Sequence, residues 1–171
     1  MQSMCSQNFE NVSNKSKDLM LSAIRNLILF EDVDISDLYA SCPNRMLWEA
    51  IQKKNAAIIE WEDIPAFLQQ QECMVYVFPE PMIDLYRGQH VRCSTIDSRT
   101  LRDYFNRDSV IIVDELKVPV SNSGFDTPVY FFDVKLSWML VLTAENKADG
   151  TQLCVLLSAG QDRTGDGSLS W

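Results

Sequence analysis

The sequence predicts an α+β fold, with a mainly antiparallel sheet and helices packed on one face, in a single domain. Helix-like periodicity occupies the first part of the chain, strand-like segments lie among helices in the middle, and three strand-like segments follow one another at the end. A chain of 171 residues has the size of one domain. We expect residues 15–158 to form it, with 1–14 as a disordered N-terminus and 159–171 as a flexible tail.

The first expected helix begins near Ser16, which can cap it, and its apolar residues recur at three- and four-residue spacing up to Phe30. The acidic segment Glu31–Asp37 ends this helix, because a helix C-terminus repels carboxylates. We read that segment as a solvated linker. A second helix is expected over residues 41–55, with Pro43 in its first turn.

The middle of the chain alternates short strands and helices. A strand is expected over residues 56–61, a helix over 62–71 with Asp63 as its cap, and a buried strand over 73–78. Residues 82–93 fit no single period and could form a turn between two extended pieces around Gly88.

The last third begins with a helix over residues 95–108, capped by Asp97 or Ser98, and a buried strand over 109–115. Two prolines and a glycine predict a loop over 116–128. Strands are then expected over residues 129–132, 137–143 and 152–158, with a hairpin signal at Asp149 and Gly150.

The run from Val129 to Thr143 is rich in aromatic and aliphatic residues, and it could be a working surface or only scaffold. A platform that stacks nucleic-acid bases places exposed aromatics next to lysine and arginine. Here Trp138 lies between Ser137 and Met139, in a strand that is apolar on both faces. We therefore expect this run to be scaffold at the centre of the sheet.

The net charge of −9, from 24 acidic and 15 basic residues, disfavours nucleic acid and anionic membranes as partners. No local basic patch compensates for it, since the arginines of residues 87–107 alternate with aspartates. Such a charge favours a basic protein partner, although solubility alone is the simpler explanation.

Five widely spaced cysteines and a single histidine allow no ordinary zinc site, and no phosphate-binding glycine motif is present. We expect no metal and no cofactor. Unpaired thiols, a polar N-terminal segment and the lack of a long apolar run indicate a cytoplasmic protein.

Catalytic residues are hard to assemble from this sequence. His90 is the only histidine, and Cys93 lies three residues after it without any evident third group to orient the pair. Asp114 and Glu115 close a predicted strand, where catalytic acids occur in α/β enzymes. A hydrolase-like enzyme that uses these carboxylates with His90 is the third of our three hypotheses.

The order of motifs over residues 46–160 resembles that of cytoplasmic immunity proteins of bacterial polymorphic and contact-dependent toxin systems. The resemblance rests on "LWEAI", "CMVYVF", "LRDYF" and "SVIIVDE", followed by "VYFFDVKLSWMLVLTAENKADG" and "CVLLSAG". It implies a non-catalytic protein that binds a toxin domain and blocks its active site. Such inhibitors are often acidic when the toxin is a basic nuclease. Such families share few functional residues, so the resemblance assigns none here.

Our leading hypothesis is therefore an immunity protein that binds a basic toxin domain through an acidic surface. The second hypothesis is a non-enzymatic interaction or adaptor module. The expected partner-binding residues are all carboxylates in loops and at element ends: Asp32, Asp34, Asp37, Glu60, Glu62, Asp63, Asp114 and Glu115.

Overall fold

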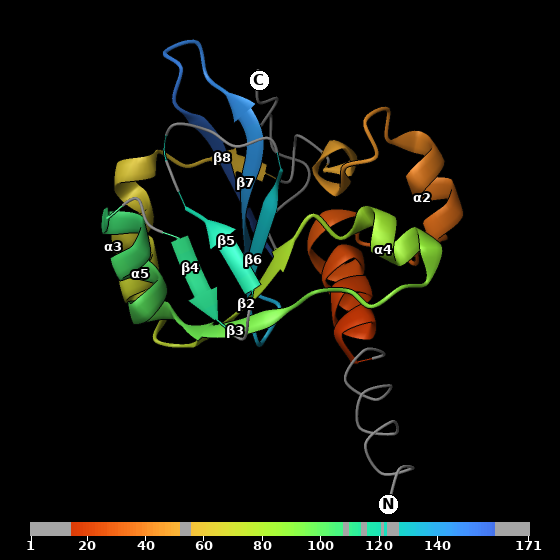
Figure 1. Ribbon diagram of the computed structural model, residues 1–171, viewed down its shortest axis with the longest axis horizontal. Helices are drawn as coiled ribbons and strands as arrows, with labels where there is room; N and C mark the ends of the chain where they lie inside the picture. Colours follow the sequence, from red (N-terminus) through yellow and green to blue (C-terminus); the bar gives the residue numbers. More distant parts are fainter. Residues whose placement is uncertain are drawn as a thin grey trace, which may run out of the picture.

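A six-stranded antiparallel sheet forms the centre of the molecule (Figure 1). The computed structural model describes residues 15–51, 56–107, 110–113, 116–120, 122 and 127–159. The sheet has the order β1-β8-β7-β6-β2-β3. Its strands are β1 (Ala56–Ile58), β2 (Met74–Pro79), β3 (Ser94–Asp97), β6 (Val129–Asp133), β7 (Trp138–Asn146) and β8 (Gln152–Ser158). A separate two-stranded sheet pairs β4 (Val110–Val113) with β5 (Leu116–Pro119).

The helices are short apart from the first, in which residues 15–23 are α-helical and η1 (Ile24–Ile28) continues as a π-helix. The others are α2 (Ile35–Ser41), η2 (Leu47–Ala50), η4 (Trp61–Asp63), α3 (Ile64–Gln71), α4 (Met82–Arg87) and α5 (Ser98–Arg107). No helix among the described residues has both the length and the apolar character needed to cross a membrane.

Strands β6 and β7 lie in the middle of the sheet, as predicted, and all five residues of β6 are buried. Because side chains alternate along a strand, neighbouring residues of β6 face opposite sides of the sheet. Tyr130 and Phe132 belong to one core, and Val129 and Phe131 belong to another. A sheet that is apolar on both faces needs cover on both.

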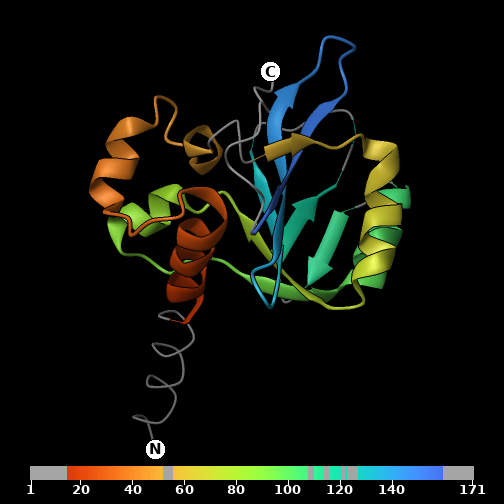
Figure 2. The same cartoon turned by 180° about the vertical axis from the view of Figure 1, so that it is seen from behind.

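The α+β class, the mainly antiparallel sheet and the single domain are confirmed, and helices cover both faces rather than one. The first core contains residues of the N-terminal helix, α2, η2 and α4. The second core contains residues of α3 and α5. Figures 1 and 2 show these two groups of helices on opposite sides of the sheet.

Several local expectations were wrong. The segment Glu31–Asp37, which we expected to be a linker, runs into a helix, α2, that begins at Ile35. Residues 82–87 form a helix, α4, and Gly88 ends it in the left-handed conformation at φ 65°. The expected loop of residues 116–128 begins with a strand, β5, which pairs with β4.

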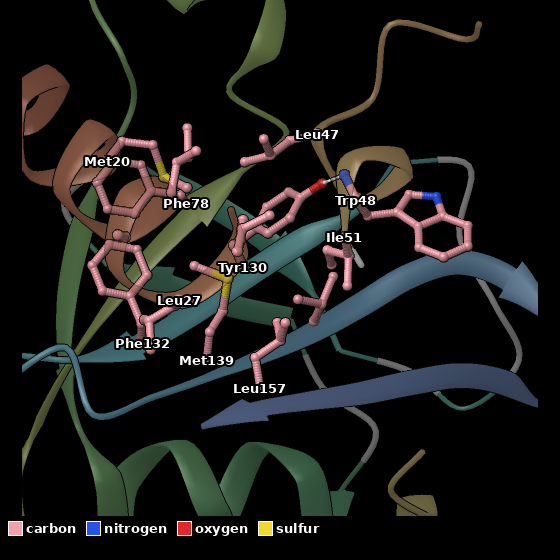
Figure 3. Packing of buried hydrophobic residues seen from close by; sticks show 14 of the residues in the cluster. Met20, Leu27, Leu47, Trp48, Ile51, Phe78, Tyr130, Phe132, Met139 and Leu157 are labelled. Carbon is pink, nitrogen blue, oxygen red and sulfur yellow. Dashed lines mark hydrogen bonds between the residues drawn. The ribbon is translucent and has the colours of Figure 1, made fainter. Parts of the chain in front are cut away.

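The expected helix of residues 41–55 is also wrong over the part that is described: Ser41 is the last residue of α2, and only the 3-10 turn η2 follows. Arg45 adopts a left-handed conformation at φ 59°, which interrupts a helix. The amide of Leu47 donates to the Glu80 side chain, and the amide of Trp48 donates to the Tyr130 hydroxyl. Figure 3 shows the bond between Trp48 and Tyr130. Residues 52–55 lie outside the described part of the chain, as do the predicted N-terminal segment and most of the predicted tail.

Candidate functional site

An acidic hollow of about 410 Å³ lies where the N-terminal helix, α2 and η2 meet. Its lining consists of Leu29, Glu31, Asp32, Val33, Asp34, Asp37, Leu38, Ser41 and Ala50. Three of the predicted binding residues, Asp32, Asp34 and Asp37, are therefore brought together, and Glu31 joins them. All four carboxylate residues are exposed.

The walls of the acidic hollow are fixed by local and core contacts. Asp34 caps α2, since its Oδ1 accepts hydrogen bonds from the amides of Ser36 at 2.9 Å and Asp37 at 3.3 Å. Leu38 faces inward and anchors α2 to the first core. Asp34, Asp37, Leu38 and Ser41 are three and four residues apart, which places them on one face of the helix.

The charge of the hollow is only partly neutralised. Arg25 Nη1 lies 3.6 Å from Asp32 Oδ1, and 94% of the Asp32 side chain is exposed. A surface ion pair of this kind contributes roughly 0 to 1 kcal/mol, so it leaves Asp32 available to another cation. The hollow thus exposes four carboxylates, with one arginine beside them.

The other predicted carboxylates do not join this site. Glu60, Glu62 and Asp63 lie at and before η4, which leads into α3 over the second core (Figure 1). Glu60 forms an ion pair with Lys147, whose pKa is raised chiefly by this hydrogen bond. Asp114 and Glu115 lie outside the described residues, and the described members of the predicted acidic surface fall into two separate groups.

A second polar cluster joins η2 to the sheet, and no local sequence pattern predicts it. Glu80 accepts a hydrogen bond from the amide of Leu47, and the hydroxyl of Tyr130 accepts one from the amide of Trp48 at 2.7 Å (Figure 3). The Oε2 atom of Glu80 is enclosed and lacks a hydrogen bond of normal geometry. These contacts fix the segment that carries Ala50, and so one wall of the acidic hollow.

Burial dominates the ionisation of this cluster. It raises the pKa of Glu80 to about 7, against the opposing effect of hydrogen bonds from Leu47, Tyr130 and Met82, while nearby Glu49 raises it further. Burial also raises the pKa of Tyr130 well above its usual value. A carboxyl with such a pKa is a candidate general base, but the pKa of the nearby Cys42 thiol is raised, chiefly by burial and further by Glu49 and Glu80, which opposes its activation as a nucleophile.

The described residues do not assemble the other chemistry that we considered. His90 is exposed, and no hydrogen bond joins it to Cys93. Burial raises the pKa of the Cys93 thiol to about 12, which is opposite to the activation of a nucleophile. Cys93 lines a second hollow of about 500 Å³, between the N-terminal helix and strands β2 and β3. Within the described part of the chain, no cluster of His, Cys, Asp and Glu could hold a metal ion.

Comparison with known proteins gives no relative: no protein-family model, no curated protein and no solved structure matches this chain. The acidic hollow and the Glu80–Tyr130 cluster therefore have to be interpreted from their own geometry. Of the two, only the hollow is open to a macromolecule.

Proposed function

We propose that this chain is a non-catalytic binding protein that captures a basic protein partner at the acidic hollow. The observation that carries this proposal is the gathering of Glu31, Asp32, Asp34 and Asp37 around one hollow with Arg25 as the neighbouring cation. With a net charge of −9, the whole molecule attracts the same kind of partner. Long-range attraction of this sign accelerates encounter and selects against acidic partners.

In its most concrete form, the proposal is a cytoplasmic immunity protein that neutralises a toxin domain by covering its active site. The motif order of residues 46–160 supports this form. The partner to test first is the protein encoded directly upstream. It should bind, lose its activity in proportion to the bound fraction, and dissociate as salt is raised. Binding without loss of the partner's activity would support the adaptor hypothesis instead.

The test of the hollow is the double variant Asp32→Asn, Asp37→Asn. Asp34 is kept because it caps α2. The association rate with the partner should fall roughly 3- to 10-fold at low salt, because charges near an interface act mainly on encounter. Stopped-flow association at several salt concentrations measures this rate and its salt dependence.

The matched control is the double variant Glu62→Gln, Asp63→Asn, which removes the same amount of charge from the group over the second core. Both carboxylates are exposed, so this variant should fold normally. The association rate should change little in the control. An equal effect of the two variants, or binding that ignores salt, would contradict the proposal.

A further inference from the structure

Two tyrosines form a parallel stack on the surface where α2 and α4 contact each other. The ring centroids of Tyr39 and Tyr86 are 4.0 Å apart, and the ring planes differ by 6°. Tyr39 is partly buried against the first core, whereas Tyr86 is 47% exposed. Large aromatic side chains are usually buried more deeply than Tyr86 is, so the exposure of its ring at the end of a stack needs an explanation.

An arginine completes the stack on the side of Tyr39. The guanidinium carbon of Arg45 lies 4.5 Å from the Tyr39 ring centroid. Because Tyr86 covers one face of Tyr39 in parallel contact, Arg45 must lie over the other face. Its Nη1 also donates to the carbonyl oxygen of Tyr39 at 2.5 Å, at the C-terminal end of α2. The layers therefore run Arg45, Tyr39, Tyr86.

The outer face of Tyr86 is the open end of this stack. Among the described residues, no further ring or cation contacts Tyr86. Arg87 is its neighbour in sequence, but adjacent residues of a helix point about 100° apart. Ile83 lies one turn earlier on α4 and is 43% exposed, so it extends the apolar surface beside the ring.

This surface lies next to the acidic hollow. Asp34, Asp37 and Ser41 on one side of α2 line the hollow, and Tyr39 on the other side of the same helix carries the stack. A helix with its side chains is only about 10 to 12 Å wide. A protein interface of ordinary size, about 800 Å² on each partner, would cover both.

We propose that the open face of Tyr86, with Ile83 beside it, anchors the basic partner by stacking against an arginine guanidinium of that partner. The inference rests on the proposed function, because the acidic charge of the chain is what draws a cationic partner here. A tyrosine ring attracts cations at its face, and the planar guanidinium stacks on it better than an ammonium does. Tyrosine and arginine are also among the residues that contribute most to binding energy at interfaces.

The test uses the full chain and two synthetic peptides of equal length and charge, one with arginine and one with lysine at the same positions. The arginine peptide should bind roughly 3- to 30-fold more tightly than the lysine peptide, as measured by fluorescence anisotropy at low salt. The variant Tyr86→Leu should abolish this preference, and it should weaken binding of the arginine peptide more than binding of the lysine peptide. An unchanged circular dichroism spectrum shows that the variant is folded.

Two further variants separate this inference from the proposed function. Met74→Ala removes a side chain of similar exposure, 43%, at the far end of β2, and should keep the preference for arginine. The double variant Asp32→Asn, Asp37→Asn should lower the affinity for both peptides equally.

If that variant lowers the affinity for both peptides while Tyr86→Leu leaves the preference for arginine intact, the stacking site is wrong and the proposal for the acidic hollow stands. If Tyr86→Leu removes the preference while the hollow variant has no effect, the hollow is wrong. Equal binding of the two peptides to the unmodified chain, or no binding, overturns the stacking site.

Discussion

Glu80 is the residue whose surroundings depart most from those of an ordinary surface carboxylate. Burial raises its pKa to about 7, so the folded protein holds a proton that the unfolded chain releases near pH 4.5. Between these two values the folded state binds more protons than the unfolded state. The proton on Glu80 therefore stabilises the folded state fully below pH 4.5. This contribution to the free energy of unfolding is lost as the pH rises to about 7.

The variant Glu80→Gln should remove this loss, because a neutral amide can still accept the hydrogen bond from Leu47 but does not ionise. At pH 8 we expect the variant to be more stable than the natural chain by up to about 3 kcal/mol, and at pH 4.5 to differ little. Urea denaturation at intervals between pH 4.5 and 8 measures this difference. A constant offset at all pH values would show that Glu80 does not titrate in this range.

At the scale of the element, α2 is a helix of seven residues that depends on its cap and on one buried side chain. Asp34 supplies the cap, and Leu38 supplies the contact with the first core. A helix this short is not stable alone, so it depends on these two contributions, which come from outside its own backbone hydrogen bonds. The spacing of Asp34 and Asp37 is the local signal that could have predicted it, since a capping residue is often followed by an acidic residue three positions later.

Replacing the cap should loosen α2 and with it the acidic hollow. Asp34→Ala should lower the free energy of unfolding by about 0.5 to 2 kcal/mol, and Asp34→Ser should restore much of the loss. Amide hydrogen exchange of residues 36–41 should accelerate in the alanine variant. Asp32→Ala is the matched control, because Asp32 makes only a long surface ion pair with Arg25 and should alter stability by a few tenths of a kcal/mol.

The remaining differences between the predicted and the observed secondary structure come from contacts between distant residues. Residues 41–51 carry helix signals, yet Leu47 and Trp48 bond to side chains that lie 33 and 82 positions further along the chain. Those partners cannot be recognised in a local window. The buried strands β6, β7 and β8 were predicted correctly because their apolar runs decide the secondary structure by themselves.

The whole molecule has two cores that share one sheet. Phe132 packs in the first core and stacks on Phe78 with ring centroids 5.2 Å apart, while Phe131 packs in the second core beside Phe105. The two phenylalanines are neighbours on β6, so neither core can lose its packing without disturbing the strand that supports the other.

We therefore expect Phe131→Ala and Phe132→Ala to destabilise the domain similarly, by about 3 to 5 kcal/mol each. Both variants should unfold in one transition, with tryptophan fluorescence and far-ultraviolet circular dichroism changing together. The control is Val134→Ala, a substitution at an exposed position of the β6–β7 turn, which should have a small effect. Separate transitions for the two signals would indicate that the two cores unfold independently.

The sequence by itself determined the class of the fold and its central strands, because runs of aromatic and branched residues form buried strands in any context that covers them. It also indicated that Asp32 and Asp34 belong to an acidic segment that could bind a partner. Only the tertiary structure decided that helices cover both faces of the sheet, that Glu60 lies apart from the acidic hollow, and that Tyr39 meets Tyr86. These outcomes depend on where distant segments pack, and the geometry of packing is a property of the whole chain rather than of any local pattern.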